Sequence, residues 1–97
     1  MSYESKLKNS ETDDLFKAVL LLKDEEECYR FFEDICTIKE LQAIAQRFQV
    51  AKLLASRKTY NEIEAITSAS TATISRVNRC LLYGADGYQL ILKRMKE

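Results

Sequence analysis

The stretch TYNEIEAITSASTATISRVNRCLLYG, residues 59–84, decides the fold, because it carries the signals for two short helices and a tight turn between them. Thr59 and Glu62 have the spacing of a capping box, in which each side chain bonds a free N–H group at a helix start. The Ser-Ala-Ser segment that follows is too short for anything except a turn, and Ser70 is a good N-cap for the next helix. The sequence therefore predicts a helix-turn-helix over residues 59–83.

The second predicted helix has two chemically different faces. At 100° per residue, the apolar residues Ile74, Val77 and Leu81 fall within one narrow arc. The opposite face has short side chains near the helix start and arginines further along. Short side chains allow close approach to base edges in a major groove, and arginines reach phosphates or guanine. The candidate DNA-contacting residues are Asn61, Thr71, Ala72, Thr73, Ser75, Arg76 and Arg79.

The same pattern has a plainer interpretation. A face of Ser, Thr and Arg on a short helix is often only a solvated surface, and many helical corners have this spacing. Total charge does not decide the matter, because 15 basic and 15 acidic residues cancel. The charges are unevenly distributed, however, with net −5 over residues 1–44 and net +5 over residues 45–97. A locally basic face can dock on phosphates whatever the total charge, so the asymmetry permits DNA binding without requiring it.

The rest of the chain predicts further helices and one domain over residues 1–97. The chain has no Pro, two Gly and long runs of helix formers, which favour an all-α fold. Asp24 and Thr37 carry capping signals, Gly84 is expected to end a helix in the left-handed conformation, and Asp86 with Gln89 is expected to cap the last helix. The six predicted helices span about residues 11–22, 25–36, 38–57, 60–67, 71–83 and 87–96, after a flexible arm over residues 1–9.

Apolar stripes predict the core and an interface between chains. The helix over residues 38–57 is apolar on more than one side, so we expect it to be the central helix. A chain of 97 residues buries a modest core, and further burial through dimerisation of the helices over residues 11–36 is expected. Ile63 and Ile66 are expected to point inward, and the three cysteines are expected to be small core residues. The predicted interface or core residues are Phe16, Phe31, Phe32, Ile35, Leu41, Ile44 and Phe48.

The residue inventory argues against several classes of function. There is no His, and the three Cys show no CxxC spacing, so no metal site, cofactor or disulfide framework is expected. No apolar run approaches the roughly 18–20 residues that span a bilayer and no signal peptide opens the chain, so a cytoplasmic protein without a membrane partner is expected. No Gly-rich phosphate loop or isolated carboxylate pair is present, so we do not expect an enzyme.

The run SASTATISRV, residues 68–77, resembles the turn and recognition helix of the tryptophan repressor superfamily, and in particular of its YerC/YecD-type Trp-repressor-related proteins. The following Asn78-Arg79 and the stretch from Tyr83 to Tyr88 share this resemblance. It covers nearly the whole chain and is strongest over residues 59–88. The resemblance implies a six-helix all-α fold, an intertwined homodimer and double-stranded operator DNA as the partner.

Two positions depart from the family pattern. Ser68 stands where such turns commonly have Gly, and a left-handed Ser68 would cost roughly 1 kcal/mol. In the tryptophan repressor, the Arg matching Arg76 helps to hold the corepressor, and the next residue is a Gly that leaves space for the indole. Here Val77 fills that space, so tryptophan is not expected as a corepressor. The alternative function is a helical protein–protein interaction module that uses the aromatic stripe of Phe31, Phe32 and Phe48.

Overall fold

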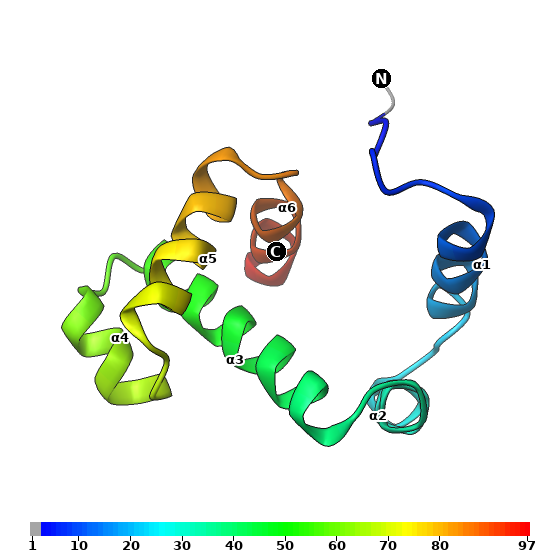
Figure 1. The fold of residues 1–97 in the computed structure, drawn as a ribbon, viewed down its shortest axis with the longest axis horizontal. Coiled ribbons are helices and arrows are strands. Elements are labelled where there is room, and N and C mark those ends of the chain that lie inside the picture. Colours follow the sequence, from blue (N-terminus) through cyan, green and yellow to red (C-terminus); the bar gives the residue numbers. More distant parts are fainter. Residues whose placement is uncertain (1–2) are drawn as a thin grey trace. The chain divides into compact units, whose positions relative to one another are not determined.

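The computed structural model describes residues 3–97, and within them the chain forms six α-helices and no strands (Figure 1). The predicted all-α fold class is confirmed. The chain divides into two compact units, an N-terminal unit that ends at Cys36 and a C-terminal unit from Thr37 to Glu97. That the two act as one domain stays a prediction. The helices are α1 (Ser10–Val19), α2 (Glu25–Ile35), α3 (Ile38–Ala55), α4 (Tyr60–Thr67), α5 (Thr71–Tyr83) and α6 (Gly87–Lys96).

Local capping explains why most helices begin where the sequence predicts. Thr37 and Thr59 each form a complete capping box, with the Thr hydroxyl and the Glu three residues later bonding each other's backbone N–H. Asp24 accepts from the Glu27 N–H at 2.9 Å, but the Glu27 carboxylate accepts from the N–H of Lys23 instead of Asp24. These contacts satisfy N–H groups that have no partner inside a helix.

Two predicted helix ends and two predicted helix caps are wrong, each for a local reason. Helix α1 ends at Val19 because the next residues form turns of three-residue spacing, and α3 ends at Ala55 because Arg57 is left-handed, with φ 65°. Gly84 is not left-handed, having φ −85° and ψ −149°. Its lack of a side chain matters differently, since a Cβ there would collide with the backbone oxygen of Cys80. Asp86 is itself left-handed and makes no capping bond to α6.

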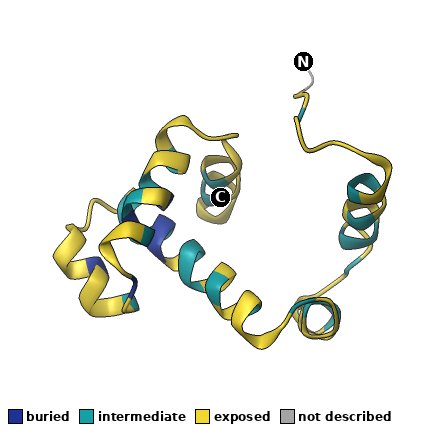
Figure 2. Cartoon of the chain, viewed as in Figure 1, coloured by how far each residue is buried: buried dark blue, intermediate teal, exposed yellow. Residues whose placement is uncertain are grey.

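The buried core lies entirely within the C-terminal unit, where α3, α4 and α5 meet (Figure 2). Helix α3 packs against α4, α5 and α6, which confirms it as the central helix of this unit. Ile63 is buried as predicted, but Ile66 is 62% exposed and its predicted inward position is wrong. Leu53, Leu54 and Tyr88 pack around the core at partial burial. The core residues are Val50, Ala51, Ile63, Ala69, Ile74 and Val77.

The described part of the N-terminal unit has no buried residue. Phe31 and Phe32 pack edge to face with ring centroids 5.5 Å apart, and both are half-buried. Cys28 and Cys80 are exposed, so the expectation that the cysteines are core residues is wrong for these two. In the predicted arm, Lys8 pairs with Asp13 of α1, while residues 1 and 2 lie outside the described residues and the arm's flexibility stays a prediction.

None of the seven predicted interface or core residues lies in the buried core of a single chain. Their assignment to an interface between chains stays a prediction. Phe31, Phe32, Leu41 and Phe48 are half-buried, and Phe16, Ile35 and Ile44 are exposed.

Candidate nucleic-acid interface

The turn between α4 and α5 is closed by Ser68 in the left-handed conformation. Its φ of 63° and ψ of 13° end α4, and its N–H still donates to the Glu64 carbonyl at 2.9 Å. The left-handed conformation expected at Ser68 is therefore present, and this conformation typically costs a residue other than Gly roughly 1 kcal/mol. The turn reverses the chain within residues 68–70, so that α5 begins immediately beside the end of α4.

Core packing and side-chain hydrogen bonds stabilise the turn in addition to its own backbone hydrogen bond. Ala69 is 2% exposed and belongs to the core, so the middle residue of the turn is anchored by packing. The Thr67 hydroxyl donates to the Ile63 carbonyl at 2.8 Å and accepts from the Ala69 N–H at 3.1 Å. From α3, the Gln46 side-chain amide donates to the Thr67 carbonyl at 3.1 Å. The direction in which α5 leaves the turn is therefore constrained by both packing and polar contacts.

Ser70 starts α5 as the sequence predicts. Its hydroxyl oxygen accepts from the Thr73 N–H at 3.1 Å and lies at the same distance from the Thr73 hydroxyl oxygen. The cap fixes the first turn of α5, which is the turn that carries the short polar side chains. The hydroxyl contact also limits how Thr73 can turn towards a ligand.

The predicted reading face lies on the solvent side of α5. Ile74 and Val77 are buried on the opposite side, and Leu81 is half-buried. Asn61 is exposed in the first turn of α4. On α5, the exposed members of the predicted set are Thr71, Ala72, Arg76 and Arg79, and the half-buried ones are Thr73 and Ser75.

Three of these residues share a shallow recess with a residue that the sequence prediction omitted. Ala72, Thr73 and Arg76 line it from α5, Arg47 lines it from α3, and its volume is about 170 Å³. We call it the arginine recess. Asn61, Thr71, Ser75 and Arg79 do not line it. A signal for Arg47 was present, since it lies three and four residues before the buried Val50 and Ala51 and so shares their helix face.

The charges on α5 have one sign, whereas the exposed Glu62 and Glu64 follow Asn61 on α4. No Asp or Glu occurs between Thr67 and Ala85. The two ion pairs found in residues 3–97 both lie in the N-terminal unit. Within the described residues, no carboxylate therefore pairs with Arg47, Arg76 or Arg79. At the start of α4, the hydrogen bonds from the backbone and hydroxyl of Thr59 lower the pKa of the Glu62 carboxyl. The arrangement favours an anionic partner.

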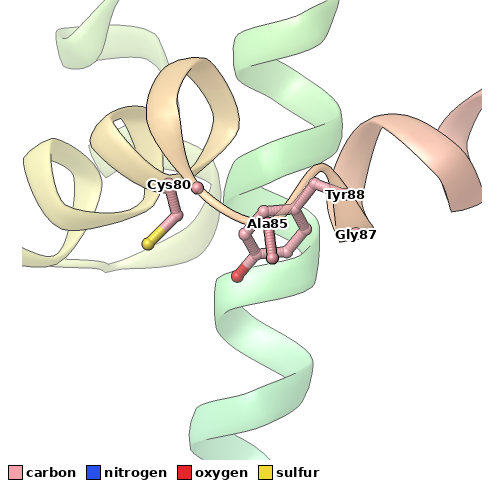
Figure 3. A pocket seen from close by; sticks show the side chains of 5 residues that line it. Cys80, Ala85, Gly87 and Tyr88 are labelled. Carbon is pink, nitrogen blue, oxygen red and sulfur yellow. The ribbon is translucent and has the colours of Figure 1, made fainter. Parts of the chain in front are cut away.

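A second hollow, between α5 and α6, has a different character (Figure 3). It is open, has a volume of about 380 Å³, and is bordered by the Cys80 thiol and the Tyr88 ring, with Gly84, Ala85 and Gly87 forming the rest of its wall. Its lining has no charged side chain. Within residues 3–97, no cluster of Cys, Asp or Glu is placed to hold a metal ion, and no helix is both long and apolar enough to cross a bilayer.

Comparison with known proteins identifies the family. The sequence model of the Trp repressor protein family matches residues 10–96. The chain belongs to the Trp repressor family. Family membership agrees with the six-helix fold and with the helix-turn-helix described above, and the family comprises DNA-binding regulators, not enzymes.

Relatives of known sequence and structure support this membership. The uncharacterised protein YerC of Bacillus subtilis (strain 168) is 59% identical over 92 residues, which cover 95% of this chain and 88% of YerC. A crystal structure of a candidate Trp repressor from Staphylococcus aureus has 52% identity and a TM-score of 0.90, covering 94% of this chain and 91% of that one. A TrpR-like protein from Eubacterium eligens ATCC 27750 has 54% identity and a TM-score of 0.91, with 94% of each chain covered. The resemblance to YerC-type members is confirmed.

Proposed function

We propose that this protein is a homodimeric transcriptional regulator that binds a palindromic operator through the exposed face of α5. The observation that carries the proposal is the division of α5 into two faces. Ile74 and Val77 are buried against the rest of the C-terminal unit, while Arg76 and Arg79 are exposed on the other side. The helix is thus held by one face and free to enter a major groove with the other.

The residues of this face have different roles in the proposal. Thr71, Ala72, Thr73 and Ser75 lie in the first two turns, where short side chains and methyl groups approach base edges. Arg76 and Arg79 contact phosphates or flanking bases, and Asn61 contacts the backbone from the start of α4. Arg57 and Lys58 are weaker candidates for phosphate contacts.

The proposed dimer is supported by the exposed apolar residues of the single chain. A contiguous apolar surface on a protein usually marks an interface. Two symmetry-related recognition helices would lie about 34 Å apart, one turn of DNA, and would read a palindrome. Large apolar side chains exposed in the N-terminal unit include Phe16, Leu20, Leu21, Tyr29 and Ile35.

Tryptophan is not the corepressor in this proposal. The Val77 side chain is only 1% exposed and packs in the core, and Val77 does not border the arginine recess. The burial of Val77 supports the proposal that its side chain occupies the space that a Gly would leave for an indole. In isothermal titration, tryptophan should give no saturable heat at micromolar to millimolar concentrations. Saturable micromolar binding would overturn this part of the proposal.

Selection from a random DNA pool by the purified protein tests the proposal as a whole. The expected result is a palindromic consensus with half-sites about one helical turn apart. The double substitution Thr73→Ala/Arg76→Ala should abolish preference for that consensus and leave the dimer intact. Arg30→Ala, which removes an exposed arginine from α2, is the matched control and should keep the preference. Enrichment of no sequence would contradict the proposal.

Sedimentation analysis separates this function from the alternative of a helical protein–protein interaction module. The half-buried pair Phe31 and Phe32 would then dock another protein, together with Phe48. A dimer at micromolar concentration supports the regulator. A stable monomer that shows no salt-dependent binding to duplex DNA would favour the interaction module.

A further inference from the structure

One side-chain hydrogen bond joins α3 to the end of α4, at the turn of the helix-turn-helix. The Gln46 Nε2 donates to the main-chain carbonyl of Thr67 at 3.1 Å, and the two residues are 21 positions apart. Both residues are half-buried. The other side-chain hydrogen bonds of α4 and the turn join residues no more than four positions apart. Within the described chain, the Gln46–Thr67 bond is therefore the side-chain hydrogen bond that ties α4 and the turn to a residue distant in sequence.

The Thr67 carbonyl has few other ways to be satisfied. It is the last carbonyl of α4, and such carbonyls have no partner within their own helix. The left-handed Ser68 ends the helix immediately after it, and the Thr67 hydroxyl already bonds the Ile63 carbonyl and the Ala69 N–H. Gln46 thus supplies a donor to a half-buried acceptor at the point where the chain reverses.

The position of this bond relates directly to the reading end of α5. The apolar contacts of Ala69, Ile74 and Val77 hold α5 in the core, but apolar contact is not directional. A hydrogen bond is directional and constrains rotation. The neighbouring residue on α3, Arg47, borders the arginine recess with Thr73 and Arg76. Consecutive residues of α3 therefore contact the turn and border the first two turns of α5.

We infer that Gln46 is a positioning residue for DNA reading, because its bond to the Thr67 carbonyl fixes the direction in which α5 leaves the turn. A small rotation of α5 would misplace groups that hydrogen-bond base edges, whereas attraction to phosphates tolerates such a rotation. Loss of the bond should therefore lower the affinity for the preferred sequence more than the affinity for other DNA. This readout rests on the proposed function.

The first experiment compares Gln46→Met with Gln49→Met. Met keeps the length of the side chain and removes the amide donor, and Gln49 is an exposed residue of the same helix with no side-chain hydrogen bond among the described residues. The ratio of dissociation constants for a scrambled and a selected duplex should fall about three- to tenfold for Gln46→Met, the effect of one hydrogen bond. It should change less than about twofold for Gln49→Met. Equal changes in both variants would overturn the inference.

Gln46→Glu sharpens the test, because an ionised carboxylate cannot donate and repels the Thr67 carbonyl. Its preference ratio should fall further than that of Gln46→Met. Thermal unfolding of each variant checks that the fold is kept. A Gln46→Glu protein with the wild-type ratio would also overturn the inference.

Amide hydrogen exchange supplies a readout that needs no DNA. In Gln46→Met, exchange should accelerate about three- to tenfold at Ser68 and Ala69, the turn amides, and should stay unchanged at Val50 and Ala51 in the core of α3. If the wild-type protein prefers no duplex, the proposed function fails while the exchange data still decide whether Gln46 holds the turn. Wild-type exchange rates at Ser68 and Ala69 in Gln46→Met would overturn the inference whatever the DNA data show.

Discussion

The two units of the chain contrast in how they use apolar residues. In the C-terminal unit, α3, α4 and α5 bury five residues, and together with Ala69 of the turn these form one core cluster. In the N-terminal unit, α1 and α2 bury none, although both helices carry large apolar side chains, of which Phe16 is 58% and Tyr29 62% exposed. Two helices joined by a short connection cannot cover each other's apolar faces completely. The contrast teaches that the helix-turn-helix is supported by its own buried core, whereas the N-terminal helices leave large apolar side chains exposed in the described chain.

The largest expected effect is on folding stability, and a pair of Ile→Ala substitutions in α4 measures it. Ile63→Ala removes a fully buried side chain and should lower the free energy of unfolding by about 2–5 kcal/mol. Ile66→Ala changes an exposed residue three positions away and should change it by less than about 0.5 kcal/mol. Chemical denaturation monitored by circular dichroism measures both. Equal losses would show that the core extends to the outer face of α4.

The next test addresses the apolar surface of the N-terminal unit. Phe16→Gln should raise the dissociation constant of the proposed dimer at least about a hundredfold, because burial of each of the two Phe16 side chains contributes about 1.5–3 kcal/mol. Lys17→Gln, at the neighbouring exposed position, should leave it nearly unchanged. Sedimentation equilibrium over a concentration series gives both constants. If Phe16→Gln dimerises like the wild type, α1 is not in the interface.

Arg57→Gly tests a smaller effect, the backbone strain at the start of the α3–α4 connection. Arg57 has φ 65°, a conformation that Gly adopts freely, so the substitution should raise the free energy of unfolding by up to about 1 kcal/mol. If Arg57 also contacts a phosphate, DNA affinity should fall, and the slope of log K against log salt should decrease by about 0.9. Lower stability of Arg57→Gly would contradict the strain argument.

Glu62→Gln should give the smallest effect, a slight loss of stability above about pH 4.5 that disappears at acid pH, where Glu62 itself is protonated. Hydrogen bonds from Thr59 lower the folded-state pKa of Glu62 below its ordinary value of 4.5, so the carboxylate stabilises the fold above pH 4.5. That contribution is lost as pH falls through the lowered pKa, and Gln should flatten this part of the stability curve. In a Thr59→Ala background the substitution should have a smaller effect that does not vanish, because the backbone N–H of residue 59 still donates to the Glu62 carboxylate. If Glu62→Gln loses as much stability at acid pH as the wild type does, other groups cause the pH dependence of stability.

The accuracy of the sequence predictions follows the range of the interactions involved. Helix starts at Asp24, Thr37, Thr59 and Ser70 were predictable because a cap involves residues only three positions apart. The left-handed Asp86 was not predictable in this way, because capping residues have several available conformations. Gly84 was correctly recognised as a helix end, but its reason is a close approach to the backbone of Cys80.

In the candidate site, too, features set by local interactions were predictable and features set by packing between helices were not. The buried and exposed faces of α5 follow from helical periodicity alone, and the structure places Ile74 and Val77 as predicted. Arg47 and Gln46 were not predicted, because their roles depend on how α4 and α5 pack against α3. The inward prediction for Ile66 was also wrong: it lies three positions after the buried Ile63, but in the last turn of α4, where it is exposed. The DNA contacts of the predicted residues stay predictions.

The separation of the two faces of α5 has a consequence for how such proteins diversify. The residues that hold the helix, Ile74 and Val77, are distinct from the exposed positions such as Ala72 and Arg76. Exposed positions of a helix usually accept substitution with little change in stability. Transplanting another member's exposed α5 residues onto this scaffold should therefore transfer its operator preference without refolding the support. The same scaffold can then acquire new binding sites in a genome by a few surface substitutions.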